Sequence, residues 1–166
     1  LSIARSDGPL PAGRKESRRL LELAAMLAAH GQAPVSLDAL ADELWPDADG
    51  DAARNALDNA LHRLRKLLGG DDRVVLRQGA LALNPQRCWS DVVALEHLLT
   101  ALDEGDTAAA PVLVSAIHRL YRAPLLPEIA LPGVVVRRRA LHQRVRRALA
   151  GAADRLAAAG LVGAAV

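Results

Sequence analysis

Apolar residues recur at helical spacing in the first half of the chain, and capping or breaking residues separate the segments. A leucine stripe predicts a helix over 15–30. Ser36 is placed to cap a short helix over 37–45. Asp51 is placed to cap a long helix over 52–68, which two glycines follow. This part of the chain is therefore expected to hold three helices.

The period changes after the third helix. Residues 73–84 are β-branched or alternating around Gln78-Gly79, which predicts a β-hairpin. Residues 1–13 alternate weakly and suit one or two short strands. Beyond Pro85 the pattern is helical again, with helices expected over 91–103 (capped by Ser90), 108–122 and 136–159, and the start of another over 161–166.

A short helix, a turn, a longer helix and a hairpin form the pattern of a winged helix-turn-helix. We therefore expect a mainly α fold with two domains, a winged helix-turn-helix with a β-hairpin wing at 1–85 and a helical domain at 86–166. The chain begins without Met and stops within an apolar stretch, so we interpret it as a piece of a longer protein with both outer ends truncated.

The helix over 52–68 has two contrasting faces when its residues are placed 100° apart. Leucines and alanines form one face. The opposite face carries amides, an imidazole and cations: Asn55, Asn59, His62 and Lys66, with Arg63 beside them and Arg54, Asp58 and Arg65 on the flank. The Asn side chain can form two hydrogen bonds with adenine in a major groove, whereas Arg and Lys bind phosphates or guanine. The alternative interpretation is the solvated face of an ordinary amphipathic helix.

The hairpin has two compatible interpretations. Arg73 and Arg77 flank a tip that contains Gly79, so a wing could hold a cation against a DNA backbone or minor groove. The second interpretation is a structural hairpin, in which Leu81 and Leu83 close the core.

Composition narrows the function classes. Hydrophobic residues make up 51% of the chain, which excludes disorder, and no apolar run approaches the length of a membrane span. The single cysteine, Cys88, excludes an internal disulfide and indicates a reducing cytoplasm; it is expected to be a small buried apolar residue. The five histidines lack metal-ligand spacing and no phosphate-cradling loop is present, so we expect neither an enzyme nor a metal or cofactor.

The aromatics Trp45, Trp89 and Tyr121 are expected in the core.

Residues 36–72 followed by VVLRQGALALN resemble the OmpR/PhoB-type winged helix-turn-helix, in the subtype of SARP-like regulators that join it to a bacterial transcriptional activator domain. The motifs that carry the resemblance are LWPD (44–47), HRLRK-x-LG (62–69), CWSDV (88–92) and YRAPLLP (121–127), and the similarity covers most of residues 14–150. Ala123 replaces the family's usual glycine, and the tryptophan that often follows the Pro-rich stretch is absent.

The resemblance implies that the helix over 52–68 is a recognition helix and that the second domain is TPR-like. The matching DNA-contact positions are Asn55, Asn59, Arg63 and Arg65, with Arg77 or Gln78 at the wing. It also implies that the turn before this helix can face RNA polymerase, which makes Asp47 and Asp49 candidate contacts; the alternative for this acidic stretch is helix capping and solubility.

We interpret the chain as a sequence-specific DNA-binding transcriptional regulator and activator, the output part of a larger protein, that binds double-stranded DNA in tandem or as a homodimer. Its rival is a protein-interaction module whose winged helix no longer binds DNA, which the net charge of only +2 would fit.

A basic run contains Arg137, Arg138, Arg139, Arg144, Arg146 and Arg147. It is interpreted as a solvated helix face, partly paired with Glu128 or acids upstream; the alternative is contact with DNA or an acidic partner.

Overall fold

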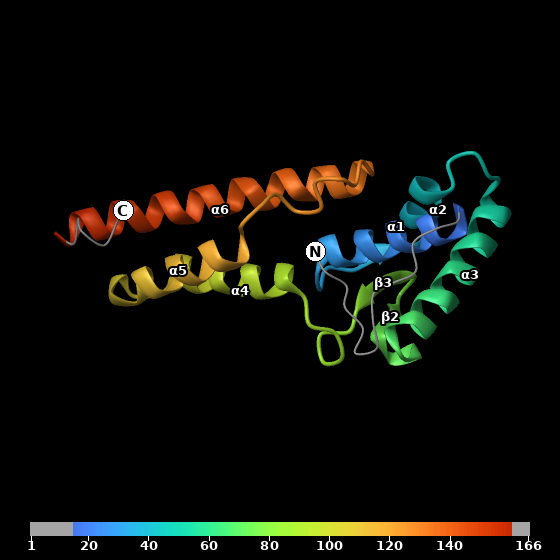
Figure 1. Ribbon diagram of the computed structural model, residues 1–166, viewed down its shortest axis with the longest axis horizontal. Helices are drawn as coiled ribbons and strands as arrows, with labels where there is room; N and C mark the ends of the chain where they lie inside the picture. Colours follow the sequence, from blue (N-terminus) through green and yellow to red (C-terminus); the bar gives the residue numbers. More distant parts are fainter. Residues whose placement is uncertain (1–14, 161–166) are drawn as a thin grey trace.

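The computed structural model describes residues 15–160 as two packed parts (Figure 1). The first part contains α1 (Lys15–His30), β1 (Val35–Ser36), α2 (Leu37–Leu44), α3 (Gly50–Leu68), η1 (Asp71–Arg73), β2 (Val74–Arg77) and β3 (Ala80–Leu83). The second contains α4 (Asp91–Glu104), η2 (Thr107–Ala109), α5 (Ala110–Leu120) and α6 (Pro132–Ala158). The predicted mainly α fold with a winged helix-turn-helix and a following helical domain is confirmed. The strands expected within 1–13 and the helix expected over 161–166 lie outside the described residues.

The first three helices follow in the predicted order. Side-chain caps explain where α2 and α3 begin. The Ser36 hydroxyl accepts a 3.1 Å hydrogen bond from the N–H of Ala39 and caps α2, as expected. The prediction that Asp51 caps the next helix is wrong. Asp49 does so, because its carboxylate accepts a 2.8 Å bond from the N–H of Ala52, and α3 consequently begins at Gly50.

The three strands form one antiparallel sheet in the order β1-β3-β2. Gln78 and Gly79 both have positive φ, 50° and 74°, which is the conformation that a two-residue hairpin turn requires. β1 was not predicted, because two residues carry too short a pattern to be recognised. It pairs Val35 with Leu81 and ties the segment between α1 and α2 to the hairpin.

The helical part differs from expectation at its helix ends. α6 begins at Pro132, four residues before the predicted start, because proline is well accommodated in the first turn of a helix. Ser90 occupies the N-cap position of α4 but its side chain makes no capping hydrogen bond. Asp91 substitutes for it, with its carboxylate accepting a 2.9 Å bond from the N–H of Val92.

One apolar core runs through both parts, because α1 packs on α3 and also on α4 and α6. The predictions for Trp45 and Tyr121 hold in part: both are partly buried against this core. The prediction for Trp89 is wrong, since its side chain is 78% exposed. It lies in the irregular segment between β3 and α4, where no element within residues 15–160 covers it. Cys88 in the same segment is only half-buried.

No helix within residues 15–160 is long and apolar enough to cross a membrane.

Candidate nucleic-acid interface

The two faces of α3 differ as the helical spacing predicts. Its leucine face is buried and consists of Ala53, Leu57, Ala60, Leu61 and Leu64. The opposite side is exposed and presents Asn55, Asn59, His62, Arg63 and Lys66. Figure 1 places α3 at one end of the molecule, with α1, α2 and the sheet on its inner side. α3 therefore offers one continuous row of amides, an imidazole and cations to solvent.

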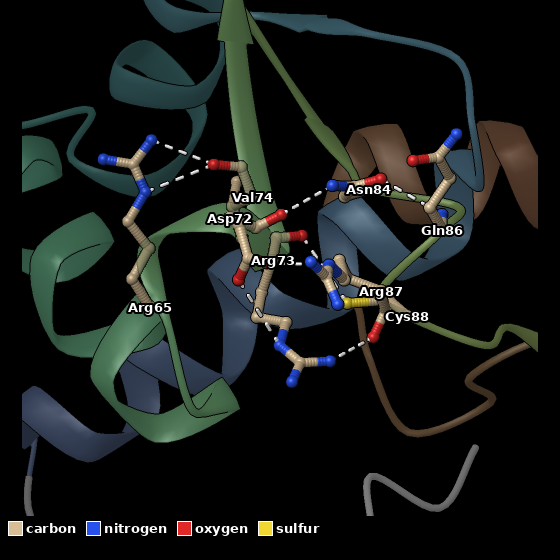
Figure 2. A network of polar contacts seen from close by, with 8 residues as sticks. All are labelled: Arg65, Asp72, Arg73, Val74, Asn84, Gln86, Arg87 and Cys88. Carbon is tan, nitrogen blue, oxygen red and sulfur yellow. Dashed lines mark hydrogen bonds and ion pairs between the residues drawn. The ribbon is translucent and has the colours of Figure 1, made fainter.

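Two flanking arginines of α3 already have partners inside the domain. Arg54 forms a 2.7 Å ion pair with Asp38 of α2. Arg65 donates from Nε and from a terminal nitrogen to the carbonyl of Val74, at 3.2 and 2.9 Å (Figure 2). The structure thus gives Arg65 a role in anchoring β2 to α3, which sequence reasoning did not foresee because it joins two elements.

The tip of the wing is exposed and basic. Arg77 and Gln78 are both exposed at the turn, and Arg77 is the last residue of β2. The expectation that Arg73 flanks the tip is wrong, since Arg73 ends η1 at the base of the hairpin. There it donates to the carbonyl of Arg87, and Figure 2 shows both within a network around Asp72. Arg77 is therefore the exposed cation at the tip of the described hairpin.

The network at the hairpin base fixes the segment that leaves the winged domain. Asp72 forms a 2.9 Å ion pair with Arg87, and its carbonyl accepts a 2.8 Å bond from the Asn84 side chain. The Cys88 thiol donates to the carbonyl of Arg73 at 3.5 Å. Burial raises the pKa of this thiol, and the nearby Arg73 guanidinium opposes the rise only in part.

The acidic stretch before α3 separates into different roles. Asp49 is the cap of α3 and Asp38 pairs with Arg54, whereas Asp47 is exposed. A groove of about 660 Å³ lies between this turn, α1 and α3. Asp47, Asn59 and Arg63 all line it, so the structure brings the candidate polymerase turn next to the candidate base-reading face. Arg19 of α1 lines the same groove and was missed, because a lone helical arginine carries no signal in sequence.

The arginine run of α6 is only half solvated. Three members have partners within the protein: Arg137 pairs with Glu96 and Arg144 donates to the hydroxyl of Thr100 at 2.7 Å. Arg138 donates to backbone carbonyls of the α5–α6 connector, including that of Ile129 at 2.7 Å. The partner acid of this run is Glu96, one of the upstream acids expected as an alternative to Glu128. The remaining three, Arg139, Arg146 and Arg147, are exposed. In Figure 1, α6 extends away from α3.

Comparison with known proteins shows what the first domain resembles. Residues 15–78 match the family model described as "Transcriptional regulatory protein, C terminal". This segment contains α1, α2, α3 and β2, so the winged helix-turn-helix part of the chain is similar to the DNA-binding domain of OmpR/PhoB-type regulators.

The relatives of the chain include EmbR, a regulator of the SARP family, which is the subtype that the sequence resemblance predicted. The chain is 42% identical over 74 residues to the transcriptional regulatory protein EmbR of Mycobacterium bovis and of Mycobacterium tuberculosis, which covers 42% of this chain and 18% of each relative. The solved structure of Mycobacterium tuberculosis EmbR in complex with a low-affinity phosphopeptide matches with a TM-score of 0.64 at 27% identity. That match covers 94% of this chain and 43% of EmbR, so both domains correspond, although the chain spans less than half the length of its relative.

Proposed function

We propose that this chain binds double-stranded DNA in a sequence-specific way and regulates transcription in the cytoplasm of a bacterium, as the output part of a longer protein. The observation that carries the proposal is the exposed polar row of α3, directly opposite its buried leucine face. A helix with this division can lie in a major groove while its apolar side remains in the core.

The residues of α3 suit different parts of a duplex. Asn55 and Asn59 lie in the first half of the helix and have the side chain that bonds adenine bidentately. Arg63 and Lys66 lie nearer its C-terminus, where they would hold phosphates, and Arg77 would hold the flanking backbone from the wing. His62 and Gln78 would add hydrogen bonds beside them. Because Arg54 and Arg65 have internal partners, we assign them to orienting α3 and the wing.

One module supplies few base contacts, so we propose binding in tandem or as a homodimer, with sites about one helical turn of DNA apart. Activation would require contact with RNA polymerase, for which the exposed Asp47 is the best-placed residue. Asp49 is less suited, because its carboxylate caps α3.

The competing function is a protein-docking module without DNA affinity. The net charge of +2 and the exposed Asp58 on α3 favour it, because both weaken attraction to phosphates. The two functions differ in the dependence of DNA affinity on salt.

The test is fluorescence anisotropy with duplexes selected from a random pool, over a range of salt concentrations. Lys66→Gln should weaken binding to all duplexes alike and reduce the salt slope by about 1. Asn59→Ala should instead relax discrimination at one base pair, by about 1–3 kcal/mol. Arg139→Gln is the matched control, because it removes one exposed cation on α6.

The proposal fails if the wild type shows no DNA affinity at low salt, or if Arg139→Gln has the same effect as Lys66→Gln. Arg65 is left unchanged, since its replacement would release the carbonyl of Val74 and disturb the wing.

A further inference from the structure

Trp89 stands exposed at the edge of a groove between the two domains. Its side chain is 78% exposed, the highest value among the large exposed apolar residues of the described chain. The groove has a volume of about 720 Å³. A large aromatic ring left in water is unusual unless it serves recognition, because its burial would be strongly favourable.

The floor of the groove is apolar and comes from both domains. The winged domain contributes side chains of α1, α3 and β3, and α5 closes the far end; the residues are Ala24, Ala28, Leu64, Leu68, Leu83 and Leu120. Leu64 belongs to the buried face of α3. The groove therefore lies on the side of α3 opposite its polar row, and a ligand here would leave that row open.

The rim of the groove is basic. Three guanidinium groups line it, those of Arg73, Arg87 and Arg119. Asp91 is the single acid among the lining residues, and its carboxylate already accepts a hydrogen bond from the N–H of Val92. Arg87 is 60% exposed although it pairs with Asp72, so it retains donors that face solvent. The charge of the rim thus complements an anionic ligand.

The wall next to Trp89 also has hydrogen-bonding capacity that the protein does not use. The hydroxyl of Ser90 is buried and has no hydrogen-bond partner among the described residues. The Nε of Arg73 is also buried without a hydrogen bond, and its nearest acid is Asp72, at 3.7 Å. Both residues line the groove. Buried polar atoms are normally paired, so a ligand that displaces the covering side chains would find the Ser90 hydroxyl available.

We propose that this groove binds an acidic peptide segment of a partner protein. An apolar side chain of the peptide packs against Trp89 and the leucine floor, while its carboxylates pair with Arg87 and Arg119. Tryptophan and arginine are the residues that most often dominate the energy of protein interfaces. A nucleic acid fits less well, because it would leave the apolar floor uncovered.

The test uses a ten-residue peptide of alternating Glu and Leu, with a Gln-for-Glu peptide as the neutral probe, and isothermal titration calorimetry at low salt. The acidic peptide should bind about tenfold more tightly than the neutral one. Trp89→Ala and Arg87→Gln/Arg119→Gln should each weaken its binding by about tenfold. The control Arg139→Gln/Arg146→Gln removes the same charge from α6 and should leave binding unchanged.

Circular dichroism checks the fold of each variant. Arg87 and Arg119 are both exposed, so the double substitution removes only the surface ion pair of Arg87 with Asp72, which contributes about 0–1 kcal/mol. Absence of acidic-peptide binding, equal binding of the two peptides, or an equal loss in the α6 control would overturn the proposal. It would also be overturned if a short DNA duplex displaced the peptide from wild type and bound more weakly to Trp89→Ala.

Discussion

The Glu43 carboxylate of α2 accepts a 2.8 Å hydrogen bond from the backbone N–H of Gly133 in the first turn of α6. The two residues lie 90 positions apart in sequence and belong to different domains. A carboxylate at a helix N-terminus satisfies a free N–H and interacts favourably with the helix dipole. Glycine permits the approach, since a Cβ at Gly133 would lie 2.8 Å from Glu43 Oε2 and from Met26 Cε.

A second contact secures the same junction. Arg137, one turn further along α6, donates to the carbonyl of Ala29 at 3.1 Å and pairs with Glu96. Because Ala29 lies in the last turn of α1 and Glu96 lies in α4, one guanidinium joins three helices. The orientation of the helical domain on the winged domain is therefore fixed by side chains at the start of α6.

Glu43→Ala should lower the free energy of unfolding by about 1–2 kcal/mol, because it leaves the first turn of α6 without its cap. Glu43→Gln should lower it less, since an amide oxygen still accepts the bond. Urea unfolding followed by circular dichroism measures both. Asp42→Ala is the control, because Asp42 is exposed and adjacent, and it should stay within about 0.5 kcal/mol of wild type. An equal loss in the Asp42 variant would contradict the capping role.

Asp49→Ala should destabilise the protein by about 1 kcal/mol through loss of the α3 cap, whereas Asp49→Ser should preserve most of the stability. Asp51→Ala should have little effect, because Asp51 is exposed in the first turn and is not the cap. The urea concentration at which each of the three variants is half unfolded ranks them by stability. A larger loss for Asp51→Ala than for Asp49→Ala would refute the assignment.

Asp47→Ala should lower activated transcription while leaving stability and DNA affinity unchanged, because the Asp47 side chain is exposed beside α3 and caps no helix. An in vitro transcription assay with purified polymerase measures the first effect, and anisotropy measures DNA binding. Glu128→Ala in the α5–α6 connector serves as a charge-matched control. Unchanged transcription would remove Asp47 as the polymerase contact.

Features with a local, periodic cause were predictable from sequence. The bounds of α1 and the two faces of α3 follow from apolar spacing, and the hairpin turn follows from the backbone needs of Gln78-Gly79. Features that depend on two distant segments were not. The pairing of Arg65 with Val74, the contact between Glu43 and Gly133, and the exposure of Trp89 all depend on what the fold places opposite each residue.

Arg138→Gln should destabilise the protein by about 2–3 kcal/mol. Its guanidinium donates to the backbone carbonyls of Leu125, Leu126 and Ile129. These three hydrogen bonds hold the connector between α5 and α6 in place. Leu126 in this connector has a φ of 45°, a conformation that needs support from its surroundings. Arg139→Gln, the exposed neighbour on α6, should be neutral within about 0.5 kcal/mol. Equal effects of the two substitutions on the urea midpoint would show that Arg138 does not organise the connector.

The Cys88 thiol should titrate at higher pH in the folded protein than in urea, because burial raises its pKa. The raised pKa means that the folded state binds this proton more tightly than the unfolded state. The corresponding stability is therefore fully present below the unfolded pKa and is lost as pH rises through the folded pKa.

The rate of alkylation by iodoacetamide against pH measures this titration without ambiguity, since Cys88 is the only cysteine of the chain. The midpoint for the native protein should lie above the ordinary pKa of a cysteine thiol, and that for the unfolded chain close to it. Asp72→Asn should move the native midpoint downward, because the Asp72 carboxylate contributes to the rise, but burial should still keep it above the unfolded value. Coincident midpoints for native and unfolded wild type would show that burial does not control this thiol.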